Sequence, residues 1–211
     1  MGWAMGTAPR TLSRPPTDGI TERVDPISCL DERTLSQASE TGTPGPGRYL
    51  EVQVGDLSVV SLYLPSGSAG PERQAAKFRF LEAFTPHLAS LRRRRRRHYI
   101  LSGDWNIAHR AIDLRNWRSN QKNSGFLPEE RAWMDRLFGP AGYVDAFREV
   151  HSEPDLYTWW SNRGQAYAKN VGWRIDYQVV SGTLAGKARK AAIYKEKRFS
   201  DHAPLIMDYE L

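Results

Sequence analysis

Asp104 and Asn106 have residue types and a spacing that could do chemistry, within the segment HYILSGDWNIAHR (residues 98–110). The apolar run from Tyr99 to Leu101 predicts a strand that finishes near Asp104, where layered α/β proteins commonly place reactive groups. Residues two positions apart in a strand point to the same side. A carboxylate and an amide there could position a water and a phosphate oxygen, or share a hard cation such as Mg²⁺. The alternative is an Asx turn, in which both side chains only cap the local backbone.

A second set of candidate residues lies in FSDHAPLIMDY (199–209) and NVGWRIDYQVV (170–180). His202 could act as a general base near neutral pH, and the adjacent Asp201 could bind a cation directly or through water. Asp176 interrupts an otherwise apolar strand, where an unpaired carboxylate would be costly. We therefore expect Asp176 to pair with His202 and to fix the tautomer of its imidazole.

These side chains form a hydrolytic set that lacks a side-chain nucleophile. The single cysteine of the chain, Cys29, falls in a segment that we expect to be disordered. The expected nucleophile is therefore a water molecule activated by a metal ion, and the expected target is a phosphate group.

A third feature is the aromatic and basic segment LYTWWSNRGQAYAKNVGW (156–173). Interleaved aromatic and basic side chains suit stacking on bases or sugars together with phosphate contacts. The alternative is a core strand that buries its aromatic side chains alternately. For the group as a whole we favour nucleic-acid contact. The residues concerned are Tyr157, Trp159, Trp160, Tyr167 and Trp173, with Arg163, Lys169 and Asn170.

The elements that must position these residues follow from hydrophobic patterning. Residues 49–65 alternate apolar and polar positions around Gly55 and Asp56, which predicts a β-hairpin. Apolar residues at helical spacing predict a helix within 70–97, and Pro128 opens a second helix that continues to Phe138. Short strands are expected around 156–160, 173–180 and 205–210. This order of elements indicates sheets flanked by helices, an α/β sandwich.

Composition sets the wider limits. A chain of 211 residues with 40% hydrophobic residues suits one sizeable packed domain. The net charge of +6 equals the contribution of Arg92 to Arg97, so it does not by itself indicate nucleic acid. This arginine run could contact nucleic acid, but the favoured interpretation is a solvated helix end. No apolar stretch long enough to span a bilayer and no signal segment is apparent, and with one cysteine we expect a soluble cytoplasmic protein.

Residues 1–47 differ in composition from the rest of the chain. They are rich in proline, glycine, serine and threonine and end in PGPG at residues 44–47. Such a segment offers too little apolar surface to offset its ordering entropy, so we expect it to be disordered. Ordered structure is expected to begin near Tyr49, and residues 48–211 to form a single domain.

Taken together, the motifs resemble the exonuclease III / apurinic-apyrimidinic endonuclease family of the endonuclease/exonuclease/phosphatase superfamily. The segments that carry the resemblance are SLYLPSG, GDWNIAH, NQKNSGFLPEERAWMDRLF, YTWWSNRG, KNVGWRIDY and FSDHAPL, in the family's order. The resemblance covers residues 48–211 and implies a four-layered α/β sandwich of the DNase I type. It also implies cleavage of double-stranded DNA beside abasic sites and from 3′ ends, with Mg²⁺ as cofactor, Mn²⁺ as an alternative, and a monomeric protein.

The resemblance assigns roles to individual residues of this chain. Asp104 would orient and deprotonate the attacking water, Asn106 would hold the nucleophile or stabilise the transition state, and His202 would contact the scissile phosphate. The implied catalytic residues are Tyr63, Asp104, Asn106, Asp176 and His202. The implied metal site is formed by Asp104, Asn106, Asp201 and His202. The implied DNA-binding residues are Asn120, Lys122, Asn123, Trp159, Lys169, Asn170, Trp173 and Ile175, of which Trp159, Trp173 and Ile175 would receive a sugar that lacks its base.

The chain departs from the family pattern at its start. The family's first strand ends in asparagine and its second ends in a glutamate that binds the metal, and neither signature is found here. We therefore expect a chain truncated at its N-terminal side that lacks the first strands of the sandwich. This leaves two alternatives to an active nuclease: a catalytically silent DNA-binding remnant of the same fold, and a phosphoesterase acting on phosphoinositides, against which KNVGWRIDY argues.

Overall fold

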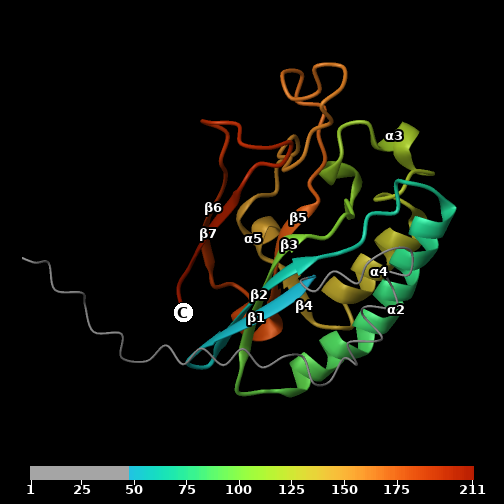
Figure 1. Cartoon of the computed structure of the whole chain (residues 1–211). Helices are drawn as coiled ribbons and strands as arrows, with labels where there is room; N and C mark the ends of the chain where they lie inside the picture. Colours follow the sequence, from blue (N-terminus) through green and yellow to red (C-terminus); the bar gives the residue numbers. More distant parts are fainter. Residues whose placement is uncertain (1–47) are drawn as a thin grey trace, which may run out of the picture.

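The computed structural model describes residues 48–211 (Figure 1). The expected disorder of residues 1–47 lies outside these described residues. In chain order the elements are β1 (Tyr49–Val54), β2 (Leu57–Tyr63), α2 (Pro71–Arg93), β3 (His98–Asp104), η1 (Ala111–Asp113), α3 (Trp117–Asn120), α4 (Pro128–Phe138), β4 (Tyr143–Asp145), α5 (Ala146–Val150), β5 (Asp176–Ser181), η2 (Gly182–Leu184), β6 (Ala188–Ile193) and β7 (Leu205–Tyr209).

Five strands form the main sheet in the order β1-β2-β3-β5-β4, and β6 pairs with β7 in a second sheet. The predicted hairpin is confirmed as β1 and β2, which join at Gly55 with φ of +59°, a value that glycine adopts without strain. Strand β3 is parallel to β2 and antiparallel to β5. The long helix after β2 supplies the crossover that a parallel β2–β3 pair requires.

The expected α/β sandwich is confirmed. Helices α2 and α4 cover one face of the five-stranded sheet, and β6 and β7 lie toward its other face (Figure 1). On the helical side, Leu62, Leu101 and Tyr177 of three neighbouring strands pack with Phe84 of α2 and Trp133 of α4. A smaller cluster fills the space between the two sheets, and its members include Ile100, Val180, Met207 and Tyr209.

Some predicted elements differ from those in the structure. The strand expected at 156–160 is wrong: this stretch has only isolated bridges, from Trp159 to Trp173 and to His202. The strand expected at 173–180 begins at Asp176 and ends at Ser181. Elements β4, α5 and β6 were not predicted, because they are three to six residues long and carry no sustained apolar period.

The arginine run lies at the opposite end of β3 from Asp104. Arg92 and Arg93 form the last turn of α2, and the helix ends there, as the helix-end interpretation requires. Arg92 and Arg97 donate to the backbone carbonyls of Pro140 and Gly55. The run therefore supports the end of α2 and its connection into β3. Among residues 48–211, no helix combines the length and the apolar character needed to cross a bilayer.

Candidate active site

Three of the predicted catalytic residues form a row across three neighbouring strands. In the strand register, Tyr63 at the end of β2 lies opposite Asp104 at the end of β3, and Asp104 lies opposite Asp176 at the start of β5. The next backbone bonds continue this row, because Leu64 N–H donates to Asp104 O at 2.9 Å and Trp105 N–H donates to Ile175 O at 2.8 Å. The sheet itself therefore fixes how far apart these side chains begin.

The turn after β3 holds Asp104 and Asn106 together. The Asn106 backbone N–H donates to Asp104 Oδ1 at 2.8 Å, and Asn106 Nδ2 donates to Asp104 Oδ2 at 2.9 Å and to Leu64 O at 2.8 Å. Asn106 adopts a left-handed φ of +52°, which asparagine tolerates better than most residues. The local capping bonds of the Asx interpretation are therefore present, yet both residues also line a pocket. Because both Nδ2 protons have acceptors, the side-chain oxygen of Asn106 is the group available to a ligand.

A buried ion pair supports this turn from behind. Lys77 of α2 and Glu130 of α4 are both fully buried and lie 2.6 Å apart, and Lys77 Nζ also donates to Asn106 O at 2.8 Å. The second carboxylate oxygen of Glu130 accepts from the backbone N–H groups of Gly125 and Leu127 at 2.7 and 3.0 Å. One ion pair thus ties the Asn106 turn to the loop on the other side of the pocket.

Asp176 and His202 lie together, as expected from the cost of an unpaired carboxylate. Asp176 Oδ2 is 2.9 Å from His202 Nδ1, which leaves Nε2 of the imidazole for a ligand. Burial lowers the pKa of His202, but the hydrogen bond and the charge of Asp176, with help from Asp104, outweigh it and raise that pKa. The imidazole is therefore biased toward its protonated form, which donates from both nitrogens.

Asp104 is held in a different electrostatic state. Burial and the nearby charge of Asp176 raise the pKa of Asp104 to about 7, against partial compensation from the Asn106 hydrogen bond, His202 and Lys77. A carboxyl group with a pKa near neutrality is suited to accept a proton in a reaction at that pH.

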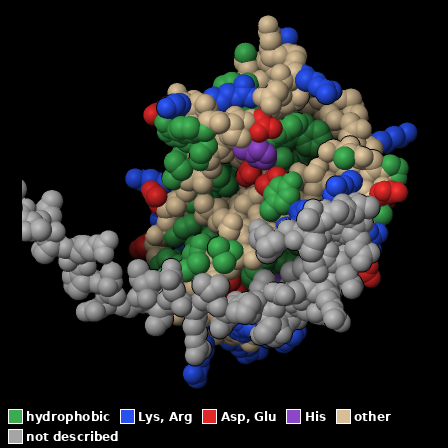
Figure 2. Space-filling model, viewed as in Figure 1, with side chains coloured by type: hydrophobic (Ala, Val, Ile, Leu, Met, Phe, Trp, Pro, Cys, Tyr) green, Lys and Arg blue, Asp and Glu red, His purple; other side chains and the backbone are tan. Residues whose placement is uncertain are grey.

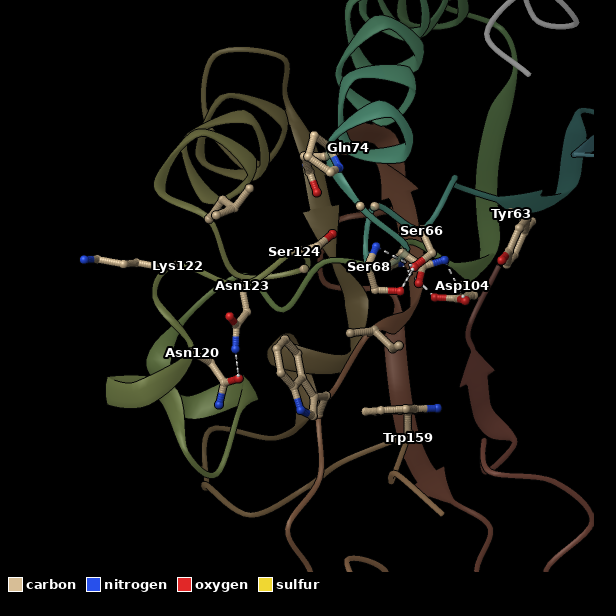
Figure 3. Close-up of a pocket in the computed structure, with 18 of the residues that line it drawn as sticks. Tyr63, Ser66, Ser68, Gln74, Asp104, Asn120, Lys122, Asn123, Ser124 and Trp159 are labelled. Carbon is tan, nitrogen blue, oxygen red and sulfur yellow. Dashed lines mark hydrogen bonds between the residues drawn. The ribbon is translucent and has the colours of Figure 1, made fainter. Parts of the chain in front are cut away.

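A pocket of about 690 Å³ brings these groups together (Figure 3). It lies beyond the ends of β2 and β3, and acidic side chains around a histidine are visible on this face of the molecule in Figure 2. Ten of the predicted residues line it: Tyr63, Asp104, Asn106, Asn120, Lys122, Asn123, Trp159, Trp173, Ile175 and His202. Nine lining residues were not predicted: Ser66, Gly67, Ser68, Gly70, Pro71, Gln74, Ser124, Gly125 and Leu127.

The apolar wall of the pocket comes from Trp159, Trp173 and Ile175. The two indole rings meet edge to face with centroids 6.3 Å apart, and Trp173 is bonded to Trp159 through paired backbone hydrogen bonds. On the other side, Asn123 Nδ2 donates to Asn120 Oδ1 at 2.8 Å, and Lys122 is exposed next to them (Figure 3). The pocket therefore has one aromatic wall and one polar wall.

Arg174, between two residues of the apolar wall, was not predicted to matter. It is fully buried and donates to Asp113 Oδ1 at 2.8 Å and to Asp145 Oδ2 at 2.6 Å. Its charge, together with that of Arg148, holds the pKa of Asp113 at about 2 although burial alone would raise it. An arginine flanked by apolar residues in the predicted strand at 173–180 could have signalled such a pair, because a buried guanidinium needs acidic partners.

Four predicted site residues do not line the pocket: Asp176, which is hydrogen-bonded to His202, and Asp201, Asn170 and Lys169. Asp201 uses both carboxylate oxygens within the protein, accepting from Trp159 Nε1 at 2.9 Å and from Ser200 Oγ at 3.0 Å, and these bonds lower its pKa against the effect of burial. Asn170 accepts from Trp160 Nε1 and donates to the backbone of its own loop, so its side chain stabilises that loop. Lys169 is exposed and does not line the pocket.

The donor set around Asp104 fits a cation that takes few protein ligands. Asp104 and Asn106 offer hard oxygens to the pocket, whereas residues 48–211 contain no group of three or more acidic, histidine or cysteine side chains that could hold a metal. Mg²⁺ commonly keeps several waters and binds one or two protein carboxylates together with substrate phosphates. Asp104 and Asn106 would therefore hold such an ion only with oxygens from water and substrate.

The chain is similar to known nucleases in sequence and to a 3′ phosphatase in structure. Residues 10–202 match the model of the Endonuclease/Exonuclease/phosphatase family. The chain is 39% identical over 162 residues to an exodeoxyribonuclease of Bacillus subtilis, covering 75% of this chain and 62% of that one. It is 36% identical to the DNA repair nuclease APEX1 of Danio rerio, covering 76% and 51%. The structure of a 3′ phosphatase from Neisseria bound to a product DNA hairpin aligns with a TM-score of 0.72 at 25% identity, covering 79% and 66%. The chain thus spans less than two thirds of the length of these relatives.

Proposed function

Because the chain belongs to the endonuclease/exonuclease/phosphatase family, we propose that it is a nuclease that hydrolyses phosphodiesters of double-stranded DNA at abasic sites and from 3′ ends. The observation that carries this proposal is the pocket in which Asp104, Asn106 and His202 face an apolar wall of tryptophans. The relatives, an exodeoxyribonuclease and a DNA repair nuclease, support the same substrate class.

Asp104 serves as the proton acceptor in this mechanism. In this proposal Asp104 takes a proton from the attacking water, and the Asn106 side-chain oxygen beside it orients that water. The pKa of about 7 applies to the protein without metal, and a bound cation would lower it. When Mg²⁺ is bound by Asp104 and Asn106, it supplies charge stabilisation at the phosphate.

His202 contacts the scissile phosphate in this proposal. Asp176 occupies Nδ1, so Nε2 is the atom that donates to a phosphate oxygen as negative charge develops there. In this proposal the Tyr63 hydroxyl, whose residue belongs to the same row of strand ends, donates to the same group. These donors are fixed by the sheet and by Asp176 before substrate arrives, which is the condition for efficient stabilisation of a transition state.

The apolar wall determines which nucleotide enters. Trp159, Trp173 and Ile175 offer no hydrogen-bond acceptors to a base edge and suit a sugar without its base. Asn120, Lys122 and Asn123 on the polar wall contact the backbone of the same strand. Lys169 and the adjacent Asn170 act, in this proposal, through a loop that reaches the DNA away from the pocket. We further propose a monomer that works in the cytoplasm, with Mn²⁺ able to replace Mg²⁺.

The test is incision of a labelled duplex with one abasic-site analogue, in Mg²⁺ and in EDTA. Magnesium-dependent cutting is expected, and D104N and H202A should each lower it at least 100-fold, as loss of a proton-transfer group does, with DNA affinity within a few-fold of the parent. The control is R79Q, because Arg79 is an exposed residue of α2 that lines neither this pocket nor the cavity next to it. Cutting by either site variant at the parental rate would refute the site assignment.

A silent DNA-binding protein is the second candidate, because Asp201 is engaged within the protein and no larger ligand cluster is found among residues 48–211. Retained DNA binding without metal-dependent incision would favour this candidate.

A further inference from the structure

We infer that a hollow beside the active-site pocket binds a second backbone phosphate of the DNA strand, next to the one that is cleaved. This hollow, of about 220 Å³, is lined by Arg48, Tyr63, Ser66, Ser68 and Arg73, with three further residues. It shares Tyr63 and both serines with the active-site pocket, so the two are adjacent. The inference rests on the proposed function, since it names a further contact of the same substrate.

Two guanidinium groups give the hollow its charge. Neither Arg48 nor Arg73 forms an ion pair with an acidic side chain within residues 48–211, and no acidic residue lines the hollow. Arg48 Nη1 is buried and has no hydrogen-bond partner among the described residues. A buried charged donor without an acceptor is costly, and an anion in the hollow would remove that cost.

The position of Arg48 is fixed by its neighbours. Its guanidinium lies over the Tyr63 ring at 5.1 Å from the centroid, and Tyr63 N–H donates to Arg48 O at 2.9 Å across the β1–β2 hairpin. Tyr63, which faces the scissile phosphate in the proposed mechanism, therefore also packs against Arg48, which lines the hollow. A ligand bound by both would be held in one orientation relative to the active site.

Hydroxyl groups complete the site. Ser66 Oγ and Ser68 Oγ lie 2.9 Å apart, and because only one of them donates in that bond, the other retains a proton for a ligand (Figure 3). Guanidinium forks and hydroxyl donors without any acidic side chain match a phosphate oxygen cluster better than a base, a sugar or a cation. Since the hollow shares Tyr63, Ser66 and Ser68 with the pocket, we assign it to the phosphate that neighbours the scissile one on the same strand.

The test measures DNA binding in EDTA, so that cleavage does not intervene, with R48Q/R73Q as the variant and R79Q as the matched control. The slope of log affinity against log salt should fall by about 0.9 for the double variant, the value for one lost phosphate contact. It should not change beyond error in R79Q. R73Q alone alters an exposed residue of α2 and is expected to fold normally and to show part of this loss.

Neutral methylphosphonate linkages identify the phosphate. A single linkage next to the scissile position on the cleaved strand should weaken binding by the parent and have no further effect on R48Q/R73Q. We call this dependence of the methylphosphonate effect on the two arginines coupling. Coupling only at linkages of the complementary strand, or an equal loss of affinity for parent and double variant at every linkage, would overturn the inference. Coupling without incision in Mg²⁺ would support the inference and refute the proposed function. Incision without coupling would support the proposed function and refute the inference. Absence of DNA binding would overturn both the inference and the proposed function.

Discussion

The buried pair between Lys77 and Glu130 allows a prediction whose size can be worked from the structure. Both side chains are fully buried, so after K77M no water replaces the ammonium beside Glu130, and Asn106 O loses its donor. Breaking a buried pair by removing one partner costs roughly 3–5 kcal/mol. Glu130 keeps three other donors, from Gln74, Gly125 and Leu127, which places the expected cost near the lower end, about 3 kcal/mol.

Urea unfolding followed by circular dichroism measures this cost directly. The K77M variant should lose about 3 kcal/mol of unfolding free energy, which for a chain of this size corresponds to a fall in Tm of roughly 6–12 °C. R79M on the exposed side of the same helix should stay within about 0.5 kcal/mol of the parent. K77M/E130Q removes both charges and should recover at least half of the loss, because it leaves no buried carboxylate without a counterion.

Two results would refute the reasoning. A K77M protein within 1 kcal/mol of the parent would mean that the pair contributes little to folding. A double variant no more stable than K77M would mean that the cost comes from packing and not from the unpaired charge.

Three further predictions concern pH and the backbone. In EDTA, Asp104 has a pKa of about 7, which burial and a neighbouring carboxylate raise above the unfolded value. Its contribution to stability is therefore full below about pH 4 and is lost as pH rises through 7. The D104N variant should not show this loss in urea unfolding, and a pH profile identical to that of the parent would contradict the prediction. The pKa of Asp113 is about 2, depressed chiefly by Arg174, so its contribution of about 2 kcal/mol to stability is present above pH 4 and is lost as pH falls toward 2. Acid titration followed by circular dichroism should show a shallower loss of stability for D113N than for the parent. Gly103 has φ of +146°, and a Cβ there would lie 1.8 Å from Leu62 O, so G103A should separate β2 from β3 and lower Tm by more than 6 °C. At Gly55 in the hairpin turn a Cβ would meet no atom within 4 Å, so G55A should lower Tm by less.

The sequence predicted which side chains lie together better than it predicted the backbone conformation that brings them together. The pairing of Asp176 with His202 followed from the cost of a lone carboxylate in an apolar strand, and the two side chains lie 2.9 Å apart. Asp104 and Asn106 do meet, but not by alternation along a strand: the strand ends at Asp104, and a left-handed turn at Asn106 brings the amide back. Periodicity does not encode such a turn, although asparagine is a residue that tolerates it.

Buried cations were the main omission. The apolar period of the long helix includes Phe78, yet the fully buried position is Lys77, one residue earlier, while Phe78 packs only at the margin of the core. The partner that makes this burial tolerable, Glu130, lies on a different helix, and no local pattern predicts that the two helices meet there. The same holds for Arg174, whose partners Asp113 and Asp145 come from two separate segments.

The row formed by Tyr63, Asp104 and Asp176 has a consequence for how this site could change over evolutionary time. Neighbouring strands lie about 4.8 Å apart, so the outer two positions of the row begin roughly 10 Å from each other whatever side chains they carry. A substitution at any of the three can alter which atoms face a substrate, but it leaves the spacing of the attachment points to the backbone. New specificities are therefore accessible here by exchanging side chains one at a time. A change in spacing would require a slip in strand register, which turns every side chain of that strand to the opposite face.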